Sequence, residues 1–362
     1  MHPNTLTAEL LQPKKHFAIL DGLRGVAALA VVIFHFMEWV SPDYSKNFIG
    51  HGYLAVDFFF CLSGFVIGYA YDSRIKEMGI KEFFKSRLIR LHPLVVLGAV
   101  LGILGFLFDP FADHTGIYSA GRLALIFACT LLLIPFPVME DRYFNLFGLN
   151  APAWSLFWEY VANIVYALVL CRLNRKVIAM LTAAAALAIC YVAYRSGTLS
   201  GGWGKASFWD GSIRVSFSFL AGLLIYRYSW IIKNRIGFIG LALLLSVAFL
   251  LPYFSFNWIV EALLVLLYFP LIVALGAGSV LSGKSEGICN FSGRISYPLY
   301  MTHYFFIWIF ASYFTSHSTT TGEQFAIISV STLLLVGLAY LALIAYDAPI
   351  RKYLTKRRMA KK

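Results

Sequence analysis

Long apolar runs separated by short polar stretches recur along the whole chain. Most of these runs approach the roughly 20 residues that a helix needs to cross the hydrocarbon core of a bilayer. None has the strict alternation of apolar and polar residues that is typical of a membrane β-barrel strand. The pattern therefore predicts an all-α, polytopic transmembrane helical bundle with about ten spans. The predicted spans lie near residues 17–39, 53–71, 92–108, 152–171, 177–194, 211–229, 236–252, 259–277, 295–313 and 323–346.

One further apolar run, residues 122–138, contains Pro135 and Pro137 and is followed by a polar segment. Proline removes a backbone donor and ends helices, and irregular backbone at membrane depth is tolerated only where protein buries it. If this run crossed the membrane, the basic cluster at 172–176 and every later basic cluster but one would break the positive-inside rule. We therefore predict a re-entrant or interfacial element here, with both termini in the cytoplasm.

The composition supports a membrane protein and also explains the positive charge. Hydrophobic residues make up 60% of the 362 residues and charged residues only 13%, too few to cover a soluble protein of this length. The formal net charge is +12, yet most of the 30 Lys and Arg residues cluster between apolar runs. Such asymmetry follows from the positive-inside rule. We therefore expect anionic membrane lipids as the counter-charge, and no nucleic acid.

The same pattern divides the chain into three parts. We expect a cytoplasmic N-terminal tail at residues 1–16, a transmembrane domain at 17–350 and a basic cytoplasmic tail at 351–362. The first sixteen residues are polar and lack the cleavage site of a signal peptide, so the first span is expected to remain as a helix.

The first predicted span contains an arginine and a histidine, Arg24 and His35, in an otherwise apolar stretch. Eleven steps of about 100° make nearly three helical turns, so both side chains share one face, about 16 Å apart along the axis. Ionisable groups inside a membrane helix are costly and usually functional. The alternative is an arginine that reaches the headgroups above an unrelated core histidine. We favour an active site on this face, with His35 for acid–base work.

Two carboxylates lie one turn from these residues. Glu38 follows His35 and is placed to accept its ring proton and so fix the tautomer. Asp21 precedes Arg24 and is placed to neutralise its charge. Both carboxylates also fit a purely structural role, which we favour for Asp21 and leave open for Glu38.

A second basic pair, Arg87 and Arg90, stands at i and i+3 in the sequence RLIRLHP, where a helix enters the membrane. Paired guanidinium groups match the geometry of phosphates, and this end is predicted to face the cytoplasm. Ordinary positive-inside anchoring explains the charge but not the close pairing. The pair is therefore a candidate site for a phosphorylated donor.

Three further motifs contain polar residues that are secondary candidates for lining the active-site cavity beside Arg24 and His35. The motifs are VDFFFCLSGFVIG, WSLFWE and ISYPLYMTHYF. Structural alternatives remain for each: Gly64 and Gly68 have helix-packing spacing, Ser155 is placed to cap a helix, and His303 fits a hydrogen-bonded core position. No zinc-binding spacing, phosphate-binding glycine loop or nucleophile elbow is present, so no metal is expected. Together with Glu38 of the first span, the secondary candidates are Asp57, Ser63, Trp154, Ser155, Glu159, Tyr300 and His303.

These elements together resemble the acyltransferase-3 family of integral membrane acyltransferases, which includes bacterial O-antigen and exopolysaccharide O-acetylases. The resemblance rests on five motifs in family order: LDGLRG…FHF, VDFFFCLSGFVIG, RLIRLHP, WSLFWE and ISYPLYMTH. It covers about residues 17 to 350. One departure lies at the end of the last span, where family members often carry a glutamate and this chain has Asp347-Ala348-Pro349.

The resemblance implies a stand-alone enzyme in the bacterial inner (cytoplasmic) membrane. It also implies an acyl-coenzyme A donor, most simply acetyl-CoA, used as a cosubstrate with no permanently bound cofactor. The implied acceptor is a hydroxyl group of a carbohydrate or a lipid-linked glycan on the extracytoplasmic side.

We therefore expect an O-acyltransferase in which Arg87 and Arg90 hold the donor's phosphates. Arg24 would position the thioester, and His35 would act as a general base or as a transient acyl carrier. The main alternative is a transporter or flippase of a glycan or lipid that performs no covalent chemistry, although the internal repeat of many transporters is not visible. A catalytically silent scaffold would not explain the face that Arg24 and His35 share.

Overall fold

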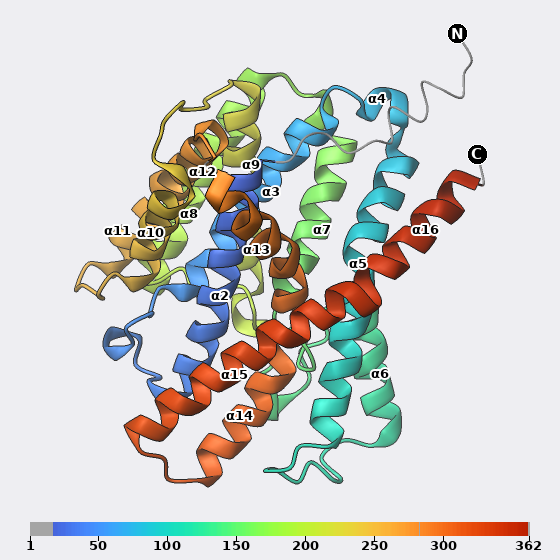
Figure 1. Ribbon diagram of the computed structural model, residues 1–362, viewed down its shortest axis with the longest axis vertical. Helices are drawn as coiled ribbons and strands as arrows, with labels where there is room; N and C mark the ends of the chain where they lie inside the picture. Colours follow the sequence, from blue (N-terminus) through green and yellow to red (C-terminus); the bar gives the residue numbers. More distant parts are fainter. Residues whose placement is uncertain (1–16, 282, 361–362) are drawn as a thin grey trace.

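The computed structural model describes residues 17–281 and 283–360, which form a bundle of helices (Figure 1). No β-strand forms among these residues, and two isolated bridges join Asn145 to Gly204 and Asn234 to Ser279. The predicted all-α class is therefore confirmed. The principal helices are α2 (Ala18–Val40), α3 (Ala55–Tyr71), α4 (Ile75–Met78), α5 (Ile80–Leu107), α6 (Ala120–Leu131), α7 (Ala153–Leu168), α8 (Arg175–Ser196), α9 (Phe208–Arg227), α10 (Gly237–Leu250), α11 (Asn257–Leu263), α12 (Phe269–Gly278), α13 (Gly283–Thr302), α14 (Tyr304–Ser316), α15 (Thr321–Leu341) and α16 (Ala348–Ala360).

Eight helical segments of the described chain are long and apolar enough to cross a membrane. Three shorter apolar helices, α6, α10 and α14, lie among them. A polytopic helical bundle is thus confirmed, while the count of about ten spans and the cytoplasmic side of both termini stay predictions. The predicted N-terminal tail, residues 1–16, lies outside the described residues.

The run at 122–138 forms a short helix followed by a non-helical return. Helix α6 has 12 residues, about 18 Å at 1.5 Å per residue, which is well short of a hydrocarbon core. After it the backbone turns at Leu133, whose φ is 54°, and the N–H of Ile134 donates to the carbonyl of Cys129. Pro135 and Pro137 then keep the chain out of a helix. This geometry agrees with an element that does not span the full bilayer.

The predicted span 295–313 is wrong as a single helix, because the chain is interrupted at His303 between α13 and α14. Pro298 lacks an N–H for the helical ladder. The hydroxyl of Thr302 donates to the carbonyl of Pro298, and Nδ1 of His303 lies 3.1 Å and 2.9 Å from the carbonyls of Leu299 and Tyr300. These side-chain bonds compete with the backbone ladder where the helix ends.

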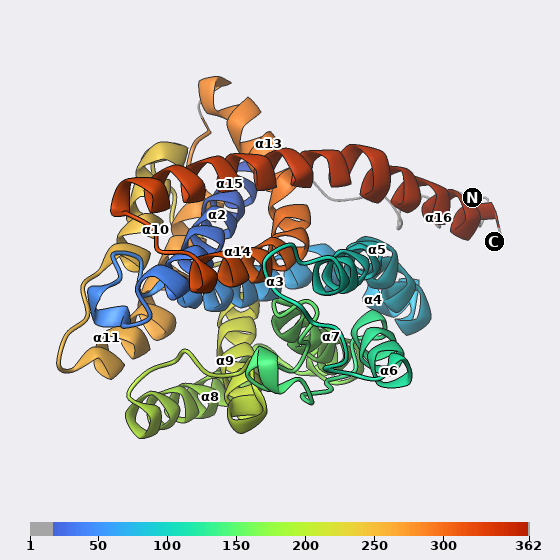
Figure 2. The same cartoon turned by 90° about the horizontal axis from the view of Figure 1, so that it is seen from below.

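The predicted span 323–346 is part of a longer helix. A π-helical stretch, Ala342–Asp347, joins α15 to α16, and the whole candidate span Thr321–Ala360 has 40 residues. It runs along one side of the bundle (Figure 2). Arg358 bonds Glu82 of α5 at 2.7 Å, so the described part of the predicted basic tail is helical and attached to α5.

Close helix contacts through glycine position the centre of the bundle. A Cβ atom at Gly25 of α2 would lie 1.8 Å from Oγ of Ser292 of α13, and one at Gly64 of α3 would lie 1.9 Å from the carbonyl oxygen of Phe219 of α9. Such approaches are possible only for residues without a side chain. The predicted packing role of Gly64 is therefore confirmed, and α13 lies directly against the face of α2 that carries Arg24.

Candidate active site

His35 and Glu38 form a paired imidazole and carboxylate near the end of α2. Nδ1 of His35 lies 2.5 Å from Oε2 of Glu38, one helical turn away. A carboxylate can only accept, so Nδ1 carries a proton, and in the neutral imidazole Nε2 then presents its lone pair. Nε2 has no hydrogen-bond partner in the described part of the chain. The predicted contact between the two side chains is therefore present, and it leaves a free basic nitrogen.

Tyr44, in the loop after α2, holds the other oxygen of this carboxylate. Its hydroxyl donates to Oε1 of Glu38 at 2.8 Å. Burial raises the pKa of Tyr44 above its ordinary value, and the charge of Glu38 adds to that shift. Tyr44 therefore stays protonated at physiological pH and remains a donor, which fixes the orientation of Glu38.

His303 lies beside His35 at the break between α13 and α14. The two rings stack with centroids 5.5 Å apart and planes inclined by 23°. Nδ1 of His303 donates to the carbonyls described above, while its Nε2 is buried with no partner among the described residues. Tyr304 meets the ring of His35 edge-on at 4.8 Å. Two imidazole nitrogens with free lone pairs thus occur in neighbouring rings.

Arg24 joins α2 to α13 on the same face. Its Nε donates to Oγ of Ser296 at 2.8 Å, and a terminal nitrogen donates to the carbonyl of Gly293 at 2.7 Å. Asp21 lies 3.2 Å from the same terminal nitrogen. Because Arg24 contacts α13 and His35 contacts the turn that ends α13, the predicted shared face is confirmed.

Arg87 pairs with a carboxylate that comes from a different helix. Oε1 of Glu159, on α7, lies 2.8 Å from Arg87 and 3.0 Å from the hydroxyl of Ser63 on α3. Arg87 is buried, and its side chain is only 6% exposed. Three of the predicted site residues are therefore in direct contact, and they tie α3, α5 and α7 together.

Arg90, one turn further along α5, has no hydrogen-bond or ion-pair partner among the described residues. Its guanidinium interacts electrostatically with those of Arg87, Arg24 and Arg351, and also with the carboxylate of Asp347. Arg351 itself bonds Asp347 at 3.0 Å, one helical turn away. Arg87, Arg24 and Arg351 each contact a carboxylate, whereas Arg90 makes no direct hydrogen bond in the described chain. Arg90 is therefore the arginine of this region that remains available to bind an anion.

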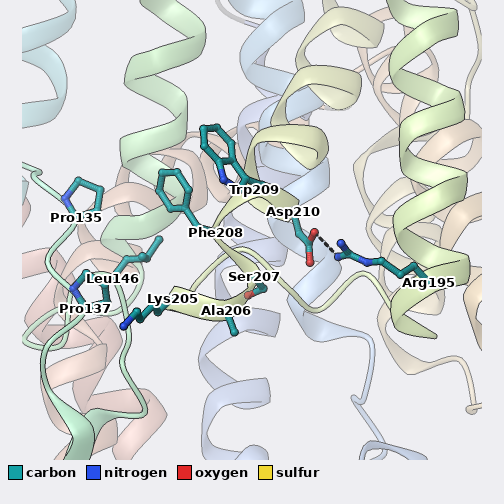
Figure 3. Close-up of a pocket in the computed structure, with 10 residues that line it drawn as sticks. All are labelled: Pro135, Pro137, Leu146, Arg195, Lys205, Ala206, Ser207, Phe208, Trp209 and Asp210. Carbon is teal, nitrogen blue, oxygen red and sulfur yellow. Dashed lines mark hydrogen bonds and ion pairs between the residues drawn. The ribbon is translucent and has the colours of Figure 1, made fainter.

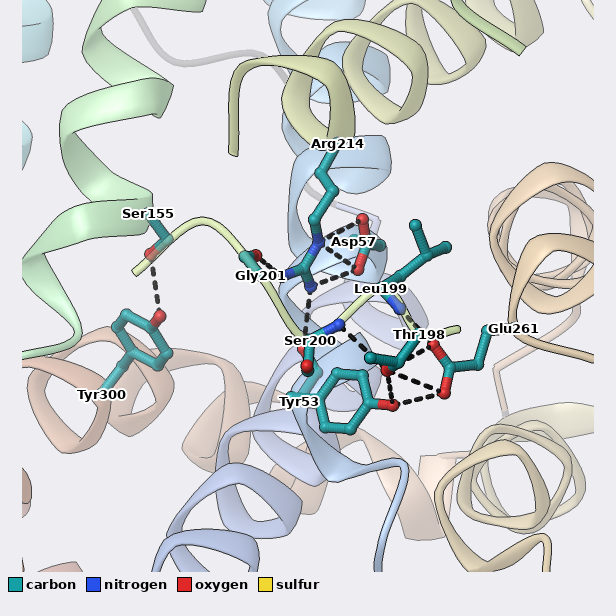
Figure 4. A network of polar contacts seen from close by, with 10 residues as sticks. All are labelled: Tyr53, Asp57, Ser155, Thr198, Leu199, Ser200, Gly201, Arg214, Glu261 and Tyr300. Carbon is teal, nitrogen blue, oxygen red and sulfur yellow. Dashed lines mark hydrogen bonds and ion pairs between the residues drawn. The ribbon is translucent and has the colours of Figure 1, made fainter. Parts of the chain in front are cut away.

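Ser155 contacts Tyr300 across the bundle (Figure 4). The two hydroxyl groups are 2.8 Å apart, and Oγ of Ser155 also donates to the carbonyl of Pro152 at 3.0 Å. The interpretation of Ser155 as a helix cap is wrong, because α7 begins at Ala153 and Pro152 holds the capping position. The helix begins two residues before Ser155, which frees this hydroxyl for Tyr300.

Asp57 lies in a separate ion pair that sequence analysis missed (Figure 4). Arg214 of α9 contacts both oxygens of Asp57, the nearest at 2.5 Å, and both side chains are 0% exposed. Arg214 also donates to the carbonyl of Gly201 and lies 5.3 Å from the ring of Trp154. These contacts occupy the carboxylate of Asp57, so it is not part of the cluster around His35. An isolated arginine in the apolar run 211–229 was the available signal.

A second missed residue is Glu261 of α11, which anchors the loop before α9 (Figure 4). Its carboxylate is fully buried and accepts from the hydroxyl of Tyr53, the side chain of Asn257 and the backbone N–H of Leu199. The bonds to Tyr53 and Leu199 connect three distant segments. Its role is to hold the loop that Arg214 also binds.

The predicted residues thus form two groups along one side of α2. Arg24 and the pair Arg87–Arg90 lie toward its beginning, while His35 lies with Glu38 and His303 toward its end. No group of three or more His, Cys, Asp or Glu side chains in the described ranges is arranged to hold a metal ion. The arrangement can bind an anionic molecule in the first group and move a proton in the second.

Comparisons with known proteins identify the family of the chain. The acyltransferase 3 family model, described as an acyltransferase domain, matches residues 17–344. Protein 2 in the picA locus of Rhizobium radiobacter is 40% identical over 164 residues, which are 43% of this chain and 83% of that protein. No solved structure matches the chain significantly.

The O-acetyltransferase OatA of Staphylococcus aureus is 34% identical over 92 residues. The aligned part is 24% of this chain and 14% of the length of OatA, so the match covers only a small part of that protein. The family model, in contrast, covers most of the chain, including both groups of candidate residues. The chain therefore belongs to the acyltransferase 3 family and is a multi-pass membrane acyltransferase.

Proposed function

We propose that the protein transfers an acetyl group from cytoplasmic acetyl-CoA to a hydroxyl group of a carbohydrate or lipid-linked glycan on the outer side of the bacterial cytoplasmic membrane. The observation that carries the proposal is the pairing of His35 with Glu38 on the same helix face as Arg24. The match to a named O-acetyltransferase supports the choice of acetyl.

The donor would enter at the arginine cluster. Arg90 makes no direct hydrogen bond or ion pair in the described chain, and phosphate groups of coenzyme A would bind its free guanidinium donors. Arg87 is held by Glu159 and would share that role. Acetyl-CoA is consumed as a cosubstrate, and no resident cofactor is required for this chemistry.

The chemical step would take place at His35. Its free Nε2 would accept the proton of the acceptor hydroxyl, and Glu38 would stabilise the imidazolium that forms. The oxygen then attacks the thioester carbonyl, the carbon–sulfur bond breaks, and the leaving thiolate of coenzyme A takes the proton from His35. Arg24 lies on the same face but about 16 Å nearer the donor's entry, so it would position the thioester limb of the donor rather than contact the reacting carbonyl.

The test is transfer of labelled acetyl from acetyl-CoA to glycan in membranes that contain the full-length protein. We expect His35→Ala to lose transfer by about 10²–10⁴-fold, the usual contribution of a positioned general base. The matched control is His317→Ala, since His317 is exposed at the end of α14. Equal amounts of each variant in the membrane must be verified by immunoblot.

The same assay separates the competing functions. Full turnover by His35→Ala would overturn the proposed mechanism. Movement of unmodified glycan across the membrane, without label transfer, would support a transporter instead. Acid quenching during turnover followed by mass spectrometry distinguishes a general base from an acyl carrier, because only the carrier adds an acetyl mass to the peptide that contains His35.

A further inference from the structure

Two adjoining cavities lie at the beginning of α9, on either side of the short helical turn Lys205–Ser207. One has a volume of about 400 Å³ and is lined by Phe208, Trp209 and the ion pair between Arg195 and Asp210 (Figure 3). The other has a volume of about 450 Å³ and is lined by Tyr143, Phe144 and Trp203. Lys205 lines both cavities.

The walls of these cavities combine exposed aromatic rings with charged groups. Trp209 is 70% exposed and Tyr143 is 60% exposed. The ammonium group of Lys205 has no partner among the described residues, while Arg195 and Asp210 bond at 2.7 Å. Aromatic anchors of a membrane interface face lipid and headgroups, but an ammonium group and an ion pair inside the same concavity favour a polar ligand. Flat rings beside hydrogen-bonding groups are suited to sugar rings, which have apolar faces and polar edges.

Backbone conformation at Tyr143 supports a ligand-binding role. Tyr143 and Phe144 have φ angles of 55° and 50°, a left-handed conformation that bulky residues rarely adopt. The N–H of Lys205 donates to the carbonyl of Phe144 at 3.1 Å, and that of Leu146 to the carbonyl of Trp203 at 2.9 Å. These bonds hold the two segments together and keep both rings at the cavity. Strained residues of this kind concentrate at functional sites.

A continuous set of ring contacts leads from this region to the candidate base. His35 contacts Tyr304 at 4.8 Å, and Tyr304 contacts Trp308 at 5.3 Å. Trp308 contacts Trp39 at 6.1 Å, and Trp39 contacts Tyr143 at 6.3 Å. The cavities therefore lie on the same end of the bundle as His35, where an acceptor hydroxyl has to be delivered.

We propose that the two cavities form one acceptor site that binds a glycan through a sugar residue carrying an anionic group. Trp209 and Tyr143 stack on sugar rings, and Lys205 binds the carboxylate or phosphate of the acidic residue. The inference rests on the proposed function, which it deepens by naming an acidic carbohydrate as the acceptor class.

The experiment uses permeabilised cells of the native host that lack the gene and are complemented with full-length variants. Labelled acetyl-CoA is supplied, and surface glycans are separated by anion exchange into acidic and neutral fractions. We expect the label in the acidic fraction. Lys205→Met should lower the initial rate about tenfold, the contribution of one charge-assisted bond, whereas Lys205→Arg should retain most of it. Lys233→Met is the control, because Lys233 is also exposed but follows the opposite end of α9.

Two aromatic variants separate ligand binding from structure. Trp209→Ala should lower the rate about tenfold. Trp230→Ala, which removes another exposed ring beyond the other end of α9, should not. Tyr143→Gly should also lower the rate, yet keep or raise the temperature of unfolding, because glycine adopts the left-handed conformation without strain. A residue with a merely structural role would not show these opposite effects.

The outcomes are distinguishable. Label only in the neutral fraction, or unchanged rates in Trp209→Ala and Tyr143→Gly, would overturn the acceptor site. A second result would also overturn the acceptor site: the variants are less abundant in the membrane, but each remaining molecule transfers acetyl at the wild-type rate. That result would indicate that these side chains anchor the protein in lipid. If the wild-type protein labels no glycan at all, the proposed function itself fails.

Discussion

The carboxylate of Glu38 lies 2.5 Å from Nδ1 of His35, and the hydroxyl of Tyr44 holds its second oxygen. This arrangement fixes one tautomer of the imidazole and aims the lone pair of Nε2 away from the carboxylate. In hydrolytic triads a carboxylate orients the histidine through the same kind of hydrogen bond, and it stabilises the imidazolium that forms during the reaction. Helix geometry alone brings the pair together, because the residues are three positions apart.

The first prediction concerns Glu38. Glu38→Gln keeps the size of the side chain but presents either an amide donor or a neutral oxygen to His35. We expect kcat to fall by about 10²–10⁴-fold while KM for acetyl-CoA stays within about twofold, because the donor site is distant. Steady-state kinetics in lipid nanodiscs measure both constants, with Glu77→Gln as an exposed control. An unchanged kcat would show that Glu38 is only structural.

The second prediction concerns the pair of Arg87 and Glu159. Removal of one partner leaves a buried charge uncompensated, so Glu159→Ala should destabilise the protein by about 3–5 kcal/mol. The double variant Arg87→Met with Glu159→Gln should recover much of that stability, since neither charge then remains. If Arg87 also contacts the donor, KM for acetyl-CoA should stay raised in this double variant. Thermal unfolding and KM are measured together, and recovery of both would assign the pair a purely structural role.

The third prediction concerns Arg90, which has no partner among the described residues. Arg90→Ala should leave the temperature of unfolding nearly unchanged, because Arg90 makes no direct hydrogen bond or ion pair in the described chain. KM for acetyl-CoA should rise about tenfold, the loss of one charge-assisted bond. The dependence of KM on salt should also weaken in this variant. Lys352→Ala is the control, and an equal rise in KM there would point to general surface charge instead.

The fourth prediction concerns the sidedness of the chain. In a background without native cysteines, Lys205→Cys should react with a membrane-impermeant maleimide added outside intact cells. Lys176→Cys should react only after the cells are opened, because its basic cluster is predicted to face the cytoplasm. Both positions are exposed and lie at opposite ends of α8 and its following loop. External labelling of Lys176→Cys would mean that the run at 122–138 crosses the membrane.

Local periodicity predicted much of the site, and long-range packing supplied the rest. The common face of Arg24 and His35 and the contact of His35 with Glu38 depend only on helix geometry, so the sequence was sufficient for both. The pairing of Asp57 with Arg214, 157 positions later, depends on how α3 and α9 pack. The interruption at His303 depends on side-chain bonds to three carbonyls in the same turn. The periodicity of hydrophobic residues does not record such bonds.

Under the proposed function, the contacts between α2 and α13 have a consequence for how the acetyl group would cross the membrane. Arg24 of α2 is hydrogen-bonded to α13. The helical rise of α2 then sets the distance between Arg24 and His35 along the helix axis at about 16 Å. The extended pantetheine arm of coenzyme A is of comparable length. Under the proposed function, the flexible arm of the donor would cover this interval, and the two halves of the bundle would not have to move relative to each other.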